Sequence, residues 1–121
     1  MKNKQTTLIV GAFLIIASIA WSSTPEPDQA KVDAGKKIFM TTCFACHGVD
    51  GKGLVPGTPD LTNDKSPLLQ ESAVLKERVL KGYQSKGSLL AMPPMGGNPA
   101  LKENEIDDVL VFMKSTFLKK K

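Results

Sequence analysis

Both cysteines and the only histidine of this 121-residue chain fall within five consecutive residues, Cys43-Phe44-Ala45-Cys46-His47. This Cys-x-x-Cys-His spacing is the attachment signature of a c-type haem. The two thiols form thioethers with the porphyrin vinyl groups, and the adjacent imidazole becomes an axial ligand of the iron. The motif therefore predicts one covalent haem c, bound through Cys43 and Cys46, with His47 as an iron ligand. Because such attachment takes place outside the cytoplasm, it also predicts an exported protein.

Three other interpretations of the motif fit less well. A structural disulfide between Cys43 and Cys46 would be strained by the two-residue gap, so such pairs are more often redox-active. A thioredoxin-like site needs a βαβ context, and no segment nearby has a strand pattern. A structural zinc site needs four ligands, whereas this chain has two cysteines and one histidine.

The N-terminal segment is typical of a secretory leader. Lys2 and Lys4 precede an apolar run over residues 8–20, and small residues follow it. The run is shorter than the roughly 20 residues that a membrane-spanning helix needs. We therefore predict a signal peptide over residues 1–22, with an uncleaved membrane anchor as the alternative, a linker over 23–31, and a single domain over 32–121.

The predicted domain has about 90 residues, a size at which a hydrophobic core alone is marginal. A covalent haem would fill the interior and stabilise such a domain. The chain has 16 basic and 12 acidic residues, and removal of Lys2 and Lys4 with the leader leaves 14 against 12. This near-neutral balance does not favour nucleic-acid binding, and we interpret the lysines at 119–121 as a solvated terminus.

Apolar periodicity predicts three helices. We expect the first from about Asp33 to Thr42, the second over residues 72–81 with Gly82 ending it, and the last from Lys102 or Glu103 to about Leu118. Proline- and glycine-rich loops separate the helices. No segment alternates with period two, so the sequence predicts an all-α domain.

The iron needs a second axial ligand, and no histidine is left to supply it. A methionine thioether is the leading donor, ahead of a lysine amine or an open site. Met40 and Met113 lie in expected helices, where a core position is usual. Met92 and Met95 lie instead in the segment Ala91-Met92-Pro93-Pro94-Met95-Gly96-Gly97, whose prolines stiffen the backbone.

The chain resembles the class I, single-haem cytochromes c, in particular the small bacterial c5 and c-555 type. The matching residues are Gly35, Phe39, the haem motif with Gly48, Thr58-Pro59-Asp60-Leu61, Met92-Pro93-Pro94 with Gly96-Gly97, and Glu105-Ile106 through Phe112.

The resemblance implies a cytochrome c fold with three to five helices around one haem. It implies Met92 as the second axial ligand, with Met95 as the alternative. It further implies that the Pro59 carbonyl accepts a hydrogen bond from His47 Nδ1, and that Phe39 packs on Phe112 where the first and last helices cross.

These features predict a periplasmic, monomeric electron carrier without enzymatic activity. It would pass one electron between a reductase and an oxidase, or other redox partner proteins, by Fe(III)/Fe(II) cycling. The alternative is a haem c subunit, or a module anchored to the membrane through its N-terminal segment, of a larger dehydrogenase or oxidase complex. A haem enzyme or gas sensor fits poorly, because the chain has no second histidine to act at an open iron site.

Overall fold

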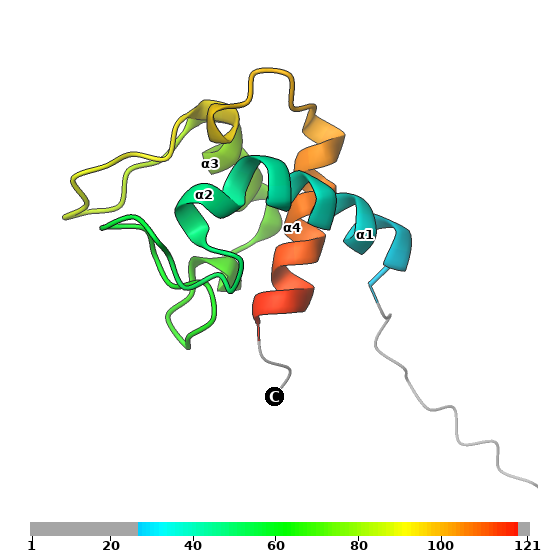
Figure 1. The fold of residues 1–121 in the computed structure, drawn as a ribbon, viewed down its shortest axis with the longest axis horizontal. Coiled ribbons are helices and arrows are strands. Elements are labelled where there is room, and N and C mark those ends of the chain that lie inside the picture. Colours follow the sequence, from blue (N-terminus) through cyan, green and yellow to red (C-terminus); the bar gives the residue numbers. More distant parts are fainter. Residues whose placement is uncertain (1–26, 119–121) are drawn as a thin grey trace, which may run out of the picture.

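A computed structural model describes residues 27–118, and the leader predicted at residues 1–22 lies outside them. The described part is helical apart from one isolated antiparallel bridge between Tyr83 and Met92, which confirms the all-α prediction (Figure 1). Its elements are α1 (Gln29–Ile38), a π-helical turn (Phe39–Cys43), α2 (Phe44–His47), a 3₁₀ turn (Pro67–Leu69), α3 (Ser72–Lys81), a second 3₁₀ turn (Pro94–Gly97) and α4 (Glu103–Phe117). None of the helices in this range has the length and apolar character needed to span a bilayer.

The first helix is longer at both ends than predicted. It begins at Gln29, because the Asp28 side chain caps it by accepting a hydrogen bond from the Ala30 amide at 3.0 Å. It does not stop at Thr42 but continues through the π-helical turn and α2 to His47. Gly48, with a φ of 77°, then ends the helical run. The haem motif is thus held at the end of one continuous helical segment.

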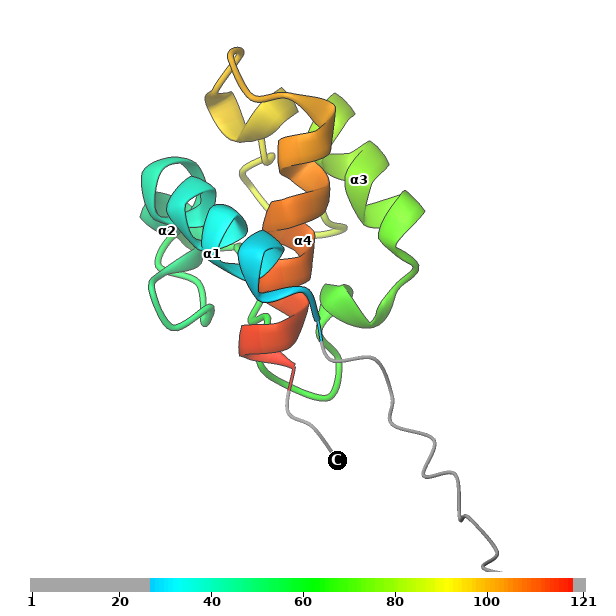
Figure 2. The same cartoon turned by 90° about the vertical axis from the view of Figure 1, so that its right-hand side faces the viewer.

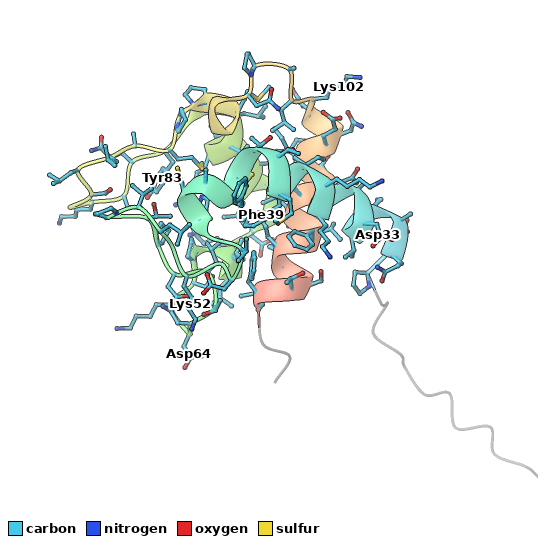
Figure 3. The ribbon with its side chains drawn as sticks, in the orientation of Figure 1. Asp33, Phe39, Lys52, Asp64, Tyr83 and Lys102 are labelled. Atoms are coloured by element: carbon cyan, nitrogen blue, oxygen red, sulfur yellow. The ribbon has the colours of Figure 1, made fainter. Side chains whose placement is uncertain are left out.

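This segment crosses α4 at very short range. A Cβ at Gly35 would overlap the Asp108 carbonyl oxygen and lie 2.8 Å from the Phe112 Cβ. Beside the crossing, the rings of Phe39, Phe112 and Phe117 form a triad with centroids 5.4–5.9 Å apart. Phe39 is fully buried between the two helices (Figure 3). The expected packing of Phe39 on Phe112 is confirmed.

Helix α3 has the predicted bounds and lies on the other side of α4 (Figure 2). Lys114 of α4 donates hydrogen bonds to the Gln70 carbonyl and the Ser72 hydroxyl, both at 3.0 Å, at the start of α3. Lys76 of α3 forms an ion pair of 2.8 Å with Asp107 of α4. These contacts place α4 in the middle of the fold, between the α1–α2 segment and α3.

The long loop after His47 folds back on the helix that precedes it. The amide of Gly53 donates to the His47 carbonyl, and that of Leu54 donates to the Cys46 carbonyl, both at 2.8 Å. These bonds pair carbonyls that the end of a helix leaves free. They also fix the loop beside the haem motif.

We predict that Gly35→Ala destabilises the protein, because the added methyl would separate α1 from α4. Overpacking of this kind costs about 1–3 kcal/mol. Urea unfolding of the haem-loaded protein measures the change. Lys36→Ala, at an exposed position of the same helix, is the control and should change the unfolding free energy by less than about 0.5 kcal/mol. A Gly35→Ala variant as stable as Lys36→Ala would contradict the close crossing.

Candidate haem site

One largely apolar cavity of about 250 Å³ lies between the haem-motif helix, α3, α4 and the two long loops. Its walls include the buried core side chains Leu61, Leu68, Leu75, Val109 and Leu110. All six residues singled out from the sequence, Cys43, Cys46, His47, Pro59, Met92 and Met95, line this cavity. Residues up to 52 positions apart in the chain thus line one cavity, as the predicted haem site requires.

The two cysteines differ in their surroundings. Cys46 is exposed, whereas Cys43 is half-buried, and both thiols are free. Burial, together with the neighbouring Cys46, raises the pKa of the Cys43 thiol to about 11. Because Cys46 is at the surface, one edge of a group bound to both sulfurs would lie close to solvent.

The His47 imidazole is partly buried, and burial lowers its pKa. A neutral ring of this kind is the form that binds metal ions. Within residues 27–118, its Nδ1 atom is buried without a hydrogen-bond partner. The predicted bond to the Pro59 carbonyl is therefore not formed in this structure, although Pro59 lines the same cavity. A buried polar atom without a partner costs about 1–3 kcal/mol, which makes this ring a poor core residue on its own.

The two methionines of the 92–95 segment are held in different ways. The Met92 backbone is fixed on both sides, because its amide donates to the Tyr83 carbonyl at 2.8 Å and its carbonyl accepts from the Tyr83 amide at 3.0 Å. Pro93 and Pro94 follow it directly. Met95 has a φ of 56°, within the left-handed region, and its side chain packs against the buried core.

Arg78 and Tyr83 also line the cavity, and neither was predicted from the sequence as a site residue. The Arg78 guanidinium lies over the Tyr83 ring, 3.9 Å from its centroid, a cation–π contact. They are the only arginine and the only tyrosine of the chain. Because each residue type occurs only once, the sequence could have drawn attention to this pair. A basic residue in the last turn of a helix is, however, also explained by the helix dipole.

The cavity has the chemistry that a haem needs. Its apolar walls suit the porphyrin face, and the cysteines at its edge suit thioether bonds. His47 and one methionine thioether would hold the iron, and Arg78 would neutralise a propionate. The Nε2 atom of His47 would bind the iron, which leaves Nδ1 to donate to a backbone carbonyl such as that of Pro59.

Comparison with known proteins agrees with this chemistry. The family model described as Cytochrome c matches residues 32–117. Cytochrome c-555 of Prosthecochloris aestuarii is 30% identical over 95 residues, which are 77% of this chain and 95% of that protein. Lupanine 17-hydroxylase [cytochrome c] of a Pseudomonas species is 33% identical over 74% of this chain but 12% of its own length. The cbb3-type cytochrome c oxidase subunit CcoP of Rhodobacter capsulatus is 33% identical over 84% of this chain and 34% of its own length.

We predict that Arg78→Gln lowers the midpoint potential of the haem by a few tens of millivolts. The ferric form carries one more positive charge than the ferrous form, so loss of a nearby cation favours the ferric form. Redox titration at low ionic strength measures the shift. Arg78→Lys is the matched control, since it keeps the charge and should retain most of the potential. An unchanged potential in Arg78→Gln would show that the guanidinium does not act on the haem.

Proposed function

Because this chain belongs to the cytochrome c family, whose members carry a covalently bound haem c, we propose that it is a periplasmic carrier. It moves one electron at a time between respiratory or other redox partner proteins. The observation that carries the proposal is the composition of the cavity, which is lined by one imidazole and by the thioethers of Met92, Met95 and Met113. Among the described residues that line it there is no carboxylate. Such a site supports retention of both axial ligands rather than acid–base chemistry on a substrate.

His47 and Met92 are the proposed axial ligands. The double hydrogen bond to Tyr83 and the two following prolines hold the Met92 backbone rigidly. A rigid ligand changes position little when the iron changes oxidation state, which suits electron transfer. Met95 packs against the core, which favours a role as an apolar cover of the haem edge. Pro59 remains the proposed acceptor for His47 Nδ1, a bond that needs a shift of the ring or of the loop.

The bound haem supplies the Fe(III)/Fe(II) couple, and the protein tunes it. Thioether ligation raises the potential relative to a second imidazole. The buried side chains around the cavity lower the local dielectric and exclude water from the iron. Electron exchange would take place at the edge next to Cys46, where Leu54, whose amide donates to the Cys46 carbonyl, is also exposed. Contacts of small, partly apolar area suit short-lived redox partners.

A second candidate is a haem c subunit or module within a larger redox complex. Two of the matched proteins favour it, because the match covers only 12% of lupanine 17-hydroxylase and 34% of the oxidase subunit CcoP. The match to cytochrome c-555 covers 95% of that protein and favours the separate carrier.

A cell-fractionation experiment distinguishes the two. Expressed in its full length in a bacterium that matures haem c, the chain should appear in the periplasmic fraction as a monomer. Its intact mass should equal that of residues 23–121 plus one haem, and N-terminal sequencing should locate the cut. Recovery of full-length protein from the membrane, or of a stable complex with a larger subunit, would instead support the second candidate.

We predict that Met92→Ala abolishes the weak far-red band that ferric haem shows with thioether ligation. The variant should also lose roughly 0.1–0.3 V of midpoint potential, within the about 0.8 V range that axial ligands span. Absorption spectroscopy and redox titration of the purified protein measure both effects. Met95→Ala is the matched control and should keep the band. The opposite pattern would assign the ligand to Met95, and absence of the band from the unmodified protein would contradict the proposed ligation.

A further inference from the structure

We propose that Thr42 and Asn98 form a positioning pair that holds the methionine loop (residues 92–98) against the helix that carries the haem cysteines. The proposal rests on the proposed function, because it takes Met92 as the iron ligand. The Asn98 side-chain amide donates a hydrogen bond to the Thr42 hydroxyl at 3.3 Å, across 56 residues of sequence. Thr42 directly precedes Cys43 and lines the cavity. This bond therefore joins the two segments that supply the proposed iron ligands.

The methionine loop needs such an external anchor because its own backbone is strained. Met95, Gly96 and Gly97 have φ values of 56°, 62° and 82°, three successive left-handed residues. Met95 is the only residue other than glycine with a positive φ in the part of the chain that the structure describes. Left-handed backbone at a residue with a Cβ persists only where the surroundings hold it.

Hydrogen bonds within the loop connect the left-handed residue Met95 to Asn98. The Gly96 amide donates to the Pro93 carbonyl at 3.0 Å, and the Asn98 amide donates to the Met95 carbonyl at 3.1 Å. The loop therefore consists of two tight, linked turns. Its beginning is fixed by the Met92–Tyr83 bridge, and its end is fixed by the Asn98 side chain on Thr42.

Thr42 contacts the loop through its methyl group as well. A Cβ at Gly96 would lie 3.2 Å from the Thr42 Cγ2, so the loop backbone approaches the helix closely at this point. The hydroxyl and the methyl of one side chain thus meet Asn98 and Gly96. Removing the hydroxyl alone leaves the methyl contact in place, which makes the hydrogen bond separately testable.

The π-helical turn explains how Thr42 reaches the loop. The Phe44 amide bonds to the Phe39 carbonyl, five residues back, so the turn contains one residue more than an α-helical turn. The Thr41 hydroxyl donates to the Lys37 and Ile38 carbonyls, at 3.0 Å and 3.1 Å. The extra residue rotates the following positions about the helix axis. Phe39 can then stay in the core while Thr42 and Cys43 face the cavity.

The pair should limit how often the methionine ligand leaves the iron. Loss of one neutral hydrogen bond changes the equilibrium between the closed and the open loop by about fivefold. Without it, the loop should open about five times more often, and an external ligand should compete more successfully for the iron.

The test is imidazole binding to the ferric, haem-loaded protein, followed by absorption spectroscopy. Thr42→Val keeps the shape of the side chain but removes the acceptor, and it should tighten imidazole binding about fivefold. Asn98→Ala removes the donor, and also the Oδ1 atom that accepts from the Ala100 amide at 3.1 Å, so it should tighten imidazole binding at least about fivefold. The double variant should bind no more tightly than Asn98→Ala. Thr42→Ser keeps the hydroxyl and should restore the original affinity to within about twofold.

Gln84→Ala is the matched control. It removes an amide that donates to the Ser88 carbonyl at 2.8 Å within the neighbouring loop and does not join that loop to the haem-motif helix. It should leave imidazole affinity unchanged. An ordinary packing role for Thr42 would lower stability in urea without this selective change in ligand affinity.

Unchanged imidazole affinity in Thr42→Val and Asn98→Ala would overturn the proposal, as would additive effects in the double variant or an equal effect of Gln84→Ala. If the unmodified protein shows the far-red thioether band, these outcomes would overturn the role of Thr42 and Asn98 but not the proposed iron ligation. Absence of that band from the unmodified protein would overturn the proposed ligation and this proposal with it.

Discussion

The close crossing of α1 over α4 is the constraint on which the rest of the structure depends. Gly35 allows the two backbones to meet, and the triad of Phe39, Phe112 and Phe117 fills the space beside the contact. Because the helical run continues from this crossing to His47, it fixes where the haem motif lies. One wall of the cavity is thereby set by packing that involves no haem ligand.

The haem completes the core of this domain as well as its chemistry. A domain of about 90 residues buries a limited apolar area. In this fold a largely apolar cavity lies between the helices and the two long loops, and the imidazole of His47 lines it. Haem binding would cover the walls of this cavity and give the imidazole its metal. The contacts between the haem and the cavity walls would therefore serve both folding and function.

Much of the fold was predictable because its signals are local. The bounds of α3 follow from apolar periodicity and Gly82, and the haem cysteines follow from their spacing. The start of the first helix was missed because Asp28 caps it within a segment that composition marks as a linker. The π-helical turn and the Thr42–Asn98 bond could not be predicted, since both depend on tertiary packing between segments far apart in the chain.

The central claim is that His47 and Met92 hold the iron in both oxidation states, which makes this cytochrome c an electron carrier. Proton and carbon NMR of the ferrous protein, with its methionine methyl groups labelled, tests this claim most directly. A methyl group bound to haem iron through its sulfur lies in the ring current and is shifted far upfield. The account predicts one such signal, assigned to Met92. Assignment of the signal to Met95, or a spectrum without any strongly shifted methionine methyl, would contradict it.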